Sequence, residues 1–581
     1  MTTQLIDDDS DDTTAASTPA FTLGNSDNLI LTSAGQLLAT GSDSNALVID
    51  GVSNEATIQG LIYGTNYGIA VSSSTGATLY VDSDVSGENT GIHITGSNAT
   101  DFLTIEAGGI VQGGSDDGIF ASALVDGITI YGSVSGTNYG INANSGYAVI
   151  TVEAGGSVSG ETAGIILSTG LSSSQLTIDG SVTSDSSVGV VVDASAATVT
   201  VNGQVDGYGA GIYSPGPDDS ITVDGTVQGE NGPGVSISSS GCALFVNGEV
   251  QADSGNYAII AIINVDPIDD ETIYIGAKGE ATGAVGIFLD EANGSSITNN
   301  GHIAGIGDGI YTSNCGSLAI TNDGTISDLG PVTSAVALAL FASSGVVHNA
   351  GLVTSPYEAF DISGGSTITI ENAGTIEGAL LVADTSAVDV ENAGVWVSSL
   401  GLDFGGSGDN ILTNSGKIHG PIELGTGANT LTNTGTITGS VTFTGTGDAL
   451  TNGGVIHGLV TMGTTDTFIN TGTVHGSVVL GTGDTLDTSA GEITGRVTAA
   501  ASDTFDYSGS FGHNTIAGFV SAGTTHDIIS FASDDFANYA AVQAHMAQVG
   551  ADVVITLDAG DTIVLLHQTL AHLVAHDFAF T

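Results

Sequence analysis

The sequence has almost no positive charge. Three of its 581 residues are basic and 63 are acidic, which gives a formal net charge of −60. Nucleic acids and anionic membrane surfaces are bound by clustered basic side chains, but Lys278, Lys417 and Arg496 are far apart. The composition therefore argues against nucleic-acid binding and membrane insertion. Because at least 60 carboxylates have no Lys or Arg to pair with, they must be spread apart, protonated or screened by metal ions.

Cysteines, long apolar runs and a secretory leader are also scarce or missing. Two cysteines, Cys242 and Cys315, cannot form a disulfide framework, and we expect both to be buried as small residues. No stretch of about 18 apolar residues is available to span a membrane. Residues 1–17 have neither a basic region nor an apolar core, so they do not resemble a cleavable signal peptide. The abundance of Gly, Thr, Ser and Asp is nevertheless typical of an extracellular protein.

A short repeat is present between residues 412 and 505. Its copies begin 19, 19, 18, 18 and 19 residues apart, at Leu412, Leu431, Leu450, Phe468, Leu486 and Phe505. Each copy has three short apolar segments separated by Asn-x-Gly, Gly and Gly-Thr-Gly corners. Runs of two to four residues with period-two alternation indicate strands, and a fixed short period indicates a solenoid. We therefore predict an all-β fold, a single long right-handed parallel β-helix of about twenty coils with a small α+β C-terminal cap.

The coils are predicted to be wider before about residue 405. A Gly-Ile or Gly-Val pair recurs there at intervals of about 22 to 28 residues, as at Gly68-Ile69 and Gly91-Ile92. Residues 1–24 are acidic and poor in apolar residues, which favours a disordered tail. The predicted organisation is this tail, a wide-coil β-helix over 25–404, a narrow-coil β-helix over 405–505 with 18–19 residues per coil, and a separate C-terminal region over 506–581.

Equivalent residues of successive coils lie above one another, so columns can be read from the repeats. One column occupies an Asn-x-Gly corner, where stacked amides can hydrogen-bond along the column; its members are Asn299, Asn322, Asn349, Asn372, Asn392, Asn414, Asn433, Asn452 and Asn470. A second column, His419, His457 and His475, shares its position with Thr438 and Thr494. We interpret the histidine column as a solvent-facing polar position, with a metal row or pH sensor as the alternative.

A carboxylate column precedes the coil starts. Its predicted members are Asp409, Asp448, Asp466, Asp484 and Asp503, with Asn410 and Asn429 continuing it toward the N-terminus. Like charges about 4.8 Å apart, the spacing of neighbouring strands, repel one another. Because oxygen ligands suit Ca²⁺, these aspartates are candidate calcium ligands. The alternative is that they are solvated corner residues.

The C-terminal region departs from the repeat. Residues 534–549 have helical spacing, and residues 553–557 and 562–566 have strand patterns. Together with Gln548–Asp552, Val554–Thr562, Thr569–Leu573 and Asp577–Phe580, this ending resembles the C-terminal export region of bacterial proteins secreted by type I machinery, the RTX group. The resemblance implies an uncleaved C-terminal signal, hence a secreted or cell-surface bacterial protein that contacts the type I export machinery.

Two further resemblances concern the coils. The segment Gly405–Leu412 resembles the calcium nonapeptide of the RTX group but has Asn410 where that motif has Asp, and later copies such as Gly481–Leu486 are one residue short. The Asn-x-Gly coils also resemble the passenger domains of autotransporter adhesins and S-layer-type repeats. Both resemblances imply an extracellular β-helical body.

An enzyme is the alternative to a structural role, because parallel β-helices also host polysaccharide lyases, epimerases and glycosidases. Such enzymes on anionic sugars need basic residues, which do not recur on neighbouring coils here. The segment Asp266–Glu271 lacks the His of an epimerase motif, and the pairs Asp116-Asp117 and Asp218-Asp219 are candidate acid–base carboxylates for a neutral glycan. The sequence favours a non-enzymatic protein.

The predicted function is a secreted structural protein that assembles with copies of itself into a surface layer, filament or biofilm matrix, with calcium as the cation that screens its charge. Cell-surface polysaccharide is a further expected partner. An adhesin or ice-binding surface is another alternative, suggested by threonine-rich segments such as Thr432-Asn433-Thr434.

Overall fold

The computed structural model describes residues 2–7, 10–72, 76–96, 101–122, 125–144, 146–253, 255–262, 268–331 and 335–581. It is an all-β parallel solenoid of about 22 turns, which confirms the predicted fold class and slightly exceeds the predicted number of coils. The chain divides into two compact units, Met1–Ile310 and Tyr311–Thr581, which are described separately. Among the described residues, no helix has both the length and the apolar character needed to cross a membrane.

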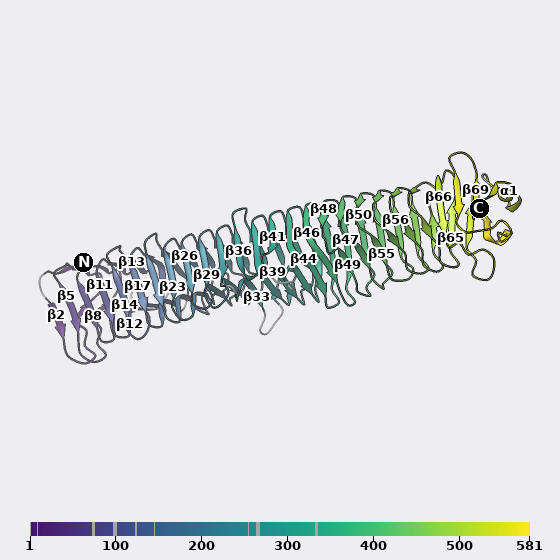
Figure 1. Ribbon diagram of the computed structural model, residues 1–581. Coiled ribbons are helices and arrows are strands. Elements are labelled where there is room, and N and C mark those ends of the chain that lie inside the picture. Colours follow the sequence, from purple (N-terminus) through teal and green to yellow (C-terminus); the bar gives the residue numbers. More distant parts are fainter. Residues whose placement is uncertain are drawn as a thin grey trace. The chain divides into compact units, whose positions relative to one another are not determined.

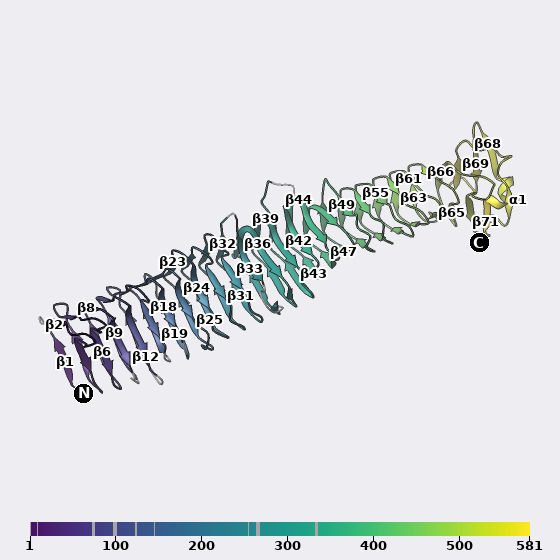
Figure 2. The same cartoon turned by 90° about the horizontal axis from the view of Figure 1, so that it is seen from below.

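A turn of the first unit consists of three short strands. In one turn these are β22 (Gln175–Ile178), β23 (Ser181–Ser184) and β24 (Val188–Val192), and the next turn repeats them as β25 (Thr198–Val201), β26 (Gln204–Gly207) and β27 (Ile212–Ser214). Each strand pairs in parallel with its equivalent one turn later. Strands of successive turns therefore lie side by side within the unit (Figures 1 and 2).

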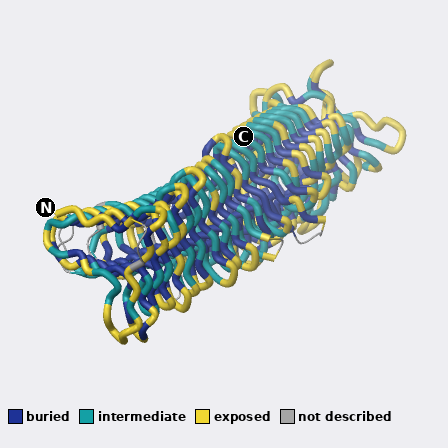
Figure 3. Tube along the Cα trace, turned by 90° about the vertical axis from the view of Figure 1, so that its left-hand side faces the viewer, coloured by how far each residue is buried: buried dark blue, intermediate teal, exposed yellow. Residues whose placement is uncertain are grey.

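The core of each unit is the inside of the coil. Alternate residues of each strand point inward, as Leu176 and Ile178 do in β22, where both are at most 1% exposed. Because the register is kept from turn to turn, these buried positions form continuous lines along the stack (Figure 3). Each turn buries its apolar side chains against the turns on either side, as expected for a solenoid.

The second unit contains the short repeat. The predicted opening residues are paired in register, Leu412 with Leu431, then Leu450, Phe468, Leu486 and Phe505. They lie in strands of one sheet, whose bounds are β50 (Ile411–Asn414), β53 (Thr430–Asn433), β56 (Ala449–Asn452), β59 (Thr467–Asn470), β62 (Thr485–Asp487) and β65 (Thr504–Tyr507). The narrow period predicted from the sequence is confirmed.

The predicted asparagine column is an amide ladder in the second unit. From Asn322 to Asn470 each side-chain Nδ2 donates to the Oδ1 of the asparagine one turn later, except at the last member, and the distances are 2.7–2.8 Å. The glycine two residues after each asparagine from Asn349 to Asn470 is required by close packing. A Cβ on Gly454, for example, would lie 2.2 Å from the carbonyl oxygen of Gly435. The corner motif thus combines buried amide stacking with close backbone contact.

The first 24 residues differ from the predicted disordered tail. Strands β1 (Thr3–Ile6), β2 (Ser10–Thr13) and β3 (Phe21–Leu23) lie within them and pair in parallel with β4 (Asn28–Leu31), β5 (Gln36–Ala39) and β6 (Leu47–Asp50). The acidic composition hid this turn because only a few of its residues are apolar and point inward, as Ile6 and Leu23 do. Asp8 and Asp9 of the acidic run lie outside the described residues.

The C-terminal helix is shorter than predicted. Instead of covering 534–549, α1 spans Tyr539–Ala544, and β68 (Met546–Val549) follows it. The Asn538 side chain caps α1 by accepting the N–H of Ala541 at 3.1 Å. Strand β68 then pairs antiparallel with β69 (Asp552–Thr556), which pairs antiparallel with β70 (Thr562–Leu565), so the two predicted strands are confirmed. The Gly550 turn, with φ of +65°, allows this hairpin to replace the last helical turns.

Candidate functional site

The predicted carboxylate column is a buried row of hydrogen-bond acceptors in the second unit. We call it the acceptor column; it contains one residue per turn, placed just before a strand, at Asn410, Asn429, Asp448, Asp466, Asp484, Asp503 and Asp527. All seven are at most 1% exposed. The column therefore lies inside the solenoid. The alternative to calcium ligands, that these aspartates are solvated corner residues, is wrong.

Each member accepts a backbone N–H from the turn before it. The Oδ1 atoms of Asp448, Asp466, Asp484, Asp503 and Asp527 accept the N–H of the preceding column member at 2.7, 2.9, 2.9, 3.1 and 2.9 Å. Asn429 Oδ1 accepts the N–H of Asn410 in the same way, and Asn410 Oδ1 accepts the N–H of Val388 in the turn before it. The shared property of the column is thus an acceptor oxygen, and negative charge is not required for it.

The second carboxylate oxygens of three column members accept N–H groups of their own turn, whereas that of Asp448 is buried without a hydrogen-bond partner. Oδ2 of Asp466 accepts from Gly463, that of Asp484 from Gly481 and that of Asp503 from Ala500, at 2.6, 2.6 and 2.8 Å. These bonds favour the charged form, but burial outweighs them and raises the pKa of both Asp466 and Asp503 to about 6. Burial also raises the pKa values of Asp448, Asp484 and Asp527.

Asp409 does not belong to the column. It is exposed, and its Oδ1 accepts the N–H of Ala428 at 2.8 Å, while Asn410 occupies the column position in its turn. Within the described ranges, no group of three or more His, Cys, Asp or Glu side chains is placed to hold a metal ion. Apart from Asp448 Oδ2, the carboxylate oxygens of the column accept backbone N–H groups, a poor fit to Ca²⁺, which takes six to eight oxygen ligands. Calcium binding at these aspartates stays a prediction.

Sequence reasoning missed part of the column. Asp527 follows Asp503 by 24 residues, outside the regular period. Ser343, Ser366 and Ser386 are also buried, and the Oγ atoms of the latter two accept the N–H groups of Ser343 and Ser366 at 3.0 Å. The pattern that could have identified these members is a short polar side chain, Ser, Asn or Asp, immediately before each strand. The prediction considered mainly carboxylates and therefore missed the serines.

The predicted histidine column faces outward, as the preferred interpretation required. His419, His457 and His475 are exposed. The rings of His457 and His475 stack with centroids 4.9 Å apart, and His419 Nδ1 lies 3.2 Å from the Thr438 hydroxyl. A metal row or pH sensor along these residues stays a hypothesis.

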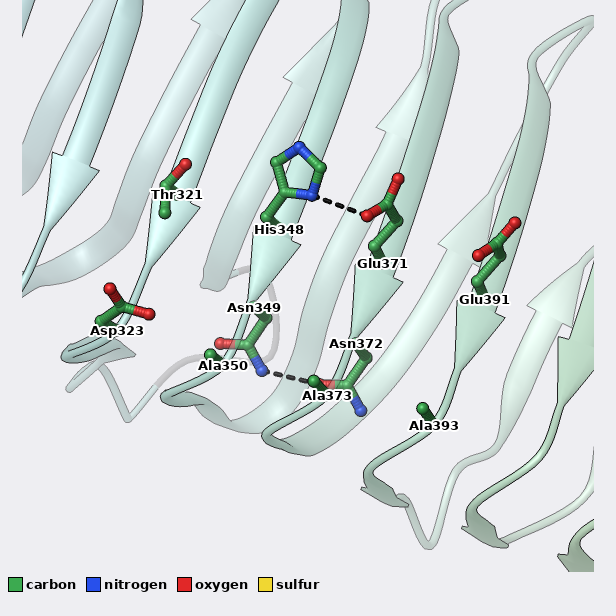
Figure 4. Close-up of a pocket in the computed structure, with 10 residues that line it drawn as sticks. All are labelled: Thr321, Asp323, His348, Asn349, Ala350, Glu371, Asn372, Ala373, Glu391 and Ala393. Atoms are coloured by element: carbon green, nitrogen blue, oxygen red, sulfur yellow. Dashed lines mark hydrogen bonds and ion pairs between the residues drawn. The ribbon is translucent and has the colours of Figure 1, made fainter.

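A shallow groove crosses four neighbouring strands of the second unit (Figure 4). We call it the histidine groove; it has a volume of about 280 Å³ and runs over β40 (Leu318–Asn322), β43 (Ser344–Asn349), β45 (Thr367–Asn372) and β47 (Ala387–Asn392). Outward residues Thr321, His348, Glu371 and Glu391 pair in register along it. Small residues at the corner, such as Ala373, leave the space open.

The chemistry of the histidine groove is that of a half-exposed contact between an imidazole and a carboxyl group, among further acidic residues. His348 Nδ1 lies 2.8 Å from Glu371 Oε2, and the two side chains are 48% and 47% exposed. Asp323 and Glu391 add negative charge at either end. Sequence reasoning did not find this groove. The pattern that indicates it is the residue immediately before each asparagine of the amide ladder, which is Thr, His, Glu and Glu in successive turns over Thr321–Asn392.

The predicted catalytic carboxylates are engaged in the fold of the first unit. Asp117 is buried and accepts from the Asn142 amide at 2.9 Å and the Tyr139 N–H at 3.3 Å. Asp219 accepts from the Ser214 hydroxyl at 2.7 Å and the Ala197 N–H at 2.8 Å. Burial raises the pKa of Asp117 to about 6 and that of Asp219 to about 7. One carboxylate of each pair therefore has a structural role.

The remaining enzyme motif is only partly described. Asp266 lies outside the described residues, and Glu271 at its other end is buried and accepts from the Ser295 hydroxyl at 2.8 Å. No family model matches the chain, and no curated protein matches it. The function proposed below therefore depends on the fold, the charge and the surfaces of the described residues.

Proposed function

We propose that this chain is a secreted bacterial structural protein that assembles with copies of itself into a surface layer, filament or biofilm matrix, and that divalent cations such as calcium promote the assembly. The observation that carries the proposal is a parallel solenoid whose first turn has open strand edges. Within the described residues, β1, β2 and β3 are each paired on one edge, with β4, β5 and β6. Unpaired strand edges are templates for pairing with another chain.

The direction of the backbone N–H and C=O groups in β1 supports pairing of its open edge with another chain. Thr2 and Ile6 turn their carbonyl oxygens toward β4, where they accept the N–H groups of Asn28 and Thr32 at 2.9 and 3.0 Å. Backbone groups alternate in direction along a strand, so the N–H of Leu5 points to the other edge. The Leu5 side chain is 62% exposed, which adds apolar surface beside that edge.

Negative charge opposes the same contact. Asp11 on β2 is exposed, and Asp7 precedes this strand. Two first turns brought together would place like charges a few ångströms apart, which costs about 1 kcal/mol per pair in water. No ion pair of a Lys or Arg occurs in the described part of the chain to offset this charge. Divalent cations between the carboxylates remove the repulsion, so assembly should depend on them.

Secretion belongs to the proposal through the C-terminal resemblance to type I-exported proteins. The two strands that the residue pattern predicts in this region, β69 and β70, form an antiparallel pair, and β70 joins the solenoid through β66 (His513–Ala517). An ending attached to the stack in this way is compatible with an uncleaved export signal. Export from a bacterial host carrying a type I system, and its loss after removal of residues 506–581, is the matching experiment.

Assembly is expected to respond to calcium. In chelator the purified full-length chain should scatter light as a monomer, and at millimolar calcium it should form larger particles that electron microscopy resolves as sheets or filaments. Sodium chloride at equal ionic strength is the control, because simple screening would act without calcium. Strict monomers at millimolar calcium contradict the proposal.

A proline at the open edge tests which surface is used. Leu5→Pro removes an N–H that β4 does not use, so the melting temperature should change by less than about 2 °C while calcium-dependent assembly falls at least tenfold. Ile30→Thr, at the equivalent outward position of β4 one turn later, is the matched control and should assemble normally. If Asp466→Asn, and not Leu5→Pro, abolishes the calcium response, calcium acts at the acceptor column and the edge model is wrong.

A polysaccharide-modifying enzyme is the second candidate, and the histidine groove is the observation that favours it. His348, Glu371 and Glu391 lie on neighbouring strands of an open groove, where a neutral glycan would meet both a base and carboxylic acids. Under the structural proposal we expect no new sugar ends after incubation with neutral and acidic glycans. Their release by the wild type, and its loss in His348→Ala, would establish the enzyme instead.

A further inference from the structure

One outward face of the first unit carries a row of threonines in register. Thr104, Thr129, Thr151, Thr177, Thr200 and Thr222 are paired turn by turn. They lie on β13 (Asp101–Ile105), β16 (Val125–Ile130), β19 (Ala148–Val152), β22, β25 and β28 (Ser220–Val223). All six are partly exposed. Successive hydroxyls along the row are therefore one strand spacing apart, about 4.8 Å.

The threonine row and the outward row beside it on the same strands have no charged residue. We call the two rows together the threonine face; over ten turns they consist of Thr78, Phe102, Gly127, Val149, Gln175, Thr198, Ser220, Ala243, Thr272 and Ser296, and of Tyr80, the six threonines, Phe245, Tyr274 and Thr298. None of these twenty positions is acidic or basic, in a chain with 63 acidic residues. Asp82, Glu106, Glu153, Asp179 and Asp224 lie two residues further along their turns and border this uncharged strip, so an anionic ligand would be repelled and a neutral one would not.

Aromatic side chains lie at both ends of the threonine row. At one end Tyr80 and Phe102 are 37% and 50% exposed. At the other end the rings of Phe245 and Tyr274 lie 6.2 Å apart at an interplanar angle of 49°, so they do not stack fully on each other. Exposed aromatic rings provide apolar surface with little loss of side-chain entropy on binding. Pyranose rings offer apolar C–H faces that match such surfaces.

The edge of the threonine face is polar and preorganised. The Asn202 amide donates to Asp179 Oδ1 at 2.6 Å, and the Asn247 amide donates to Asp224 Oδ1 at 2.8 Å. A shallow groove of about 410 Å³ runs beside Asp179, with Gly180, Gly203 and Gln204 in its lining. These groups offer fixed hydrogen-bond acceptors and donors next to the hydroxyl row.

We propose that the threonine face binds a neutral, linear polysaccharide. Such a polymer has hydroxyl groups for the threonine row and apolar ring faces for the terminal aromatics, and it carries no charge that a protein of net charge −60 would repel. Each turn supplies only a weak contact, but a repeating ligand engages many turns at once, and linked weak contacts combine into strong binding. The inference goes beyond the proposed assembly and does not depend on it.

The experiment measures retention of the full-length chain on insoluble cellulose, chitin and β-1,3-glucan in the presence of chelator, so that calcium-driven assembly does not contribute. The wild type is expected to bind at least one of the three, with retention that high salt leaves intact, and to show at least tenfold weaker retention on the anionic polymer alginate. The double variant Thr151→Asp/Thr177→Asp places charge in the middle of the face and should reduce retention at least tenfold.

Two further variants separate binding from folding. Thr413→Asp/Thr432→Asp makes the same change at outward threonines of the second unit and should bind like the wild type. Thr151→Val/Thr177→Val keeps the branched shape and removes only the hydroxyls, so it should melt like the wild type while retention falls about threefold or more. No retention on any of the three polymers, equal retention of the face and control variants, or stronger retention on alginate would overturn the proposal. Inhibition of ice recrystallisation without polysaccharide retention would overturn it in favour of an ice-binding face.

Discussion

The Asn433→Leu variant is expected to lose about 3 kcal/mol of unfolding free energy, because it interrupts the amide ladder in its middle. Asn433 accepts the Asn414 amide at 2.8 Å and donates to Asn452 Oδ1 at 2.8 Å, and it is fully buried. Leucine fills a similar volume but leaves a buried donor on Asn414 and a buried acceptor on Asn452 without their ladder partners. Unsatisfied buried polar groups cost about 1–3 kcal/mol each.

Thermal and denaturant unfolding followed by circular dichroism measures this loss. Thr432→Val, one residue earlier on the outward face, is the matched control and should stay within about 0.5 kcal/mol of the wild type. Because each turn of a solenoid contacts mainly its neighbours, the damage should appear as early unfolding of the turns around Asn433. A variant that melts together with the wild type would show that the ladder contributes little to stability.

The register of the fold could be predicted because the repeat is regular where the turns are short. Leu412, Leu431 and Leu450 share one position, and the structure pairs them in the predicted order. The asparagine ladder could be predicted from the same alignment. Asparagines at equivalent positions of successive turns lie above one another, so their amides can hydrogen-bond to each other. In these turns a single local pattern determines the strands, the corners and the stacking together.

Features that depend on three-dimensional burial could not be predicted in the same way. Asp409 and Asn410 are neighbours in the sequence and both accept a backbone N–H, yet Asn410 is buried inside the coil and Asp409 is exposed. The tail strands escaped notice because acidic residues dominated the composition while a few inward positions such as Leu23 stayed apolar. The histidine groove was missed because His348 is the only histidine in its row.

The acceptor column also predicts how stability depends on pH. Burial raises the pKa of the Asp466 and Asp503 carboxyls from the ordinary value of 3.8 to about 6, and burial raises that of Asp219 in the first unit to about 7. Below the pKa of the unfolded chain these groups are protonated in both states and the folded state carries no buried charge. Between about pH 4 and pH 6 to 7 the folded protein keeps protons that the unfolded chain has released, so stability falls as pH rises.

The melting temperature should therefore rise by about 5 °C or more when the pH is lowered from 7.5 to 5.5, the opposite of ordinary acid denaturation. The range stops above the pI of about 4.1, where loss of net charge would cause precipitation. Repulsion among surface carboxylates also lowers stability as the pH rises. The pH series is therefore repeated in 0.5 M sodium chloride, which screens surface charges more than buried ones.

The double variant Asp466→Asn/Asp503→Asn distinguishes the contribution of the acceptor column to the pH dependence of stability from that of the surface carboxylates. Asparagine already occupies the column at Asn410 and Asn429, where its Oδ1 accepts a backbone N–H from the turn before, so the substitution keeps the Oδ1 acceptor and removes the buried charge. It also replaces the Oδ2 atoms that accept the N–H groups of Gly463 and Ala500 with amide nitrogens, which cannot accept them. The rise in melting temperature of this variant between pH 7.5 and 5.5 should be at most half of the wild-type rise, whatever the loss of the two Oδ2 hydrogen bonds does to its melting temperature at pH 7.5. Asp466→Ala, which removes the acceptor as well, should melt lower at every pH by an amount equivalent to about 2 kcal/mol. A wild-type melting temperature that falls on acidification would mean that the column aspartates are ionised more readily in the folded state than in the unfolded chain, and that their backbone donors outweigh burial.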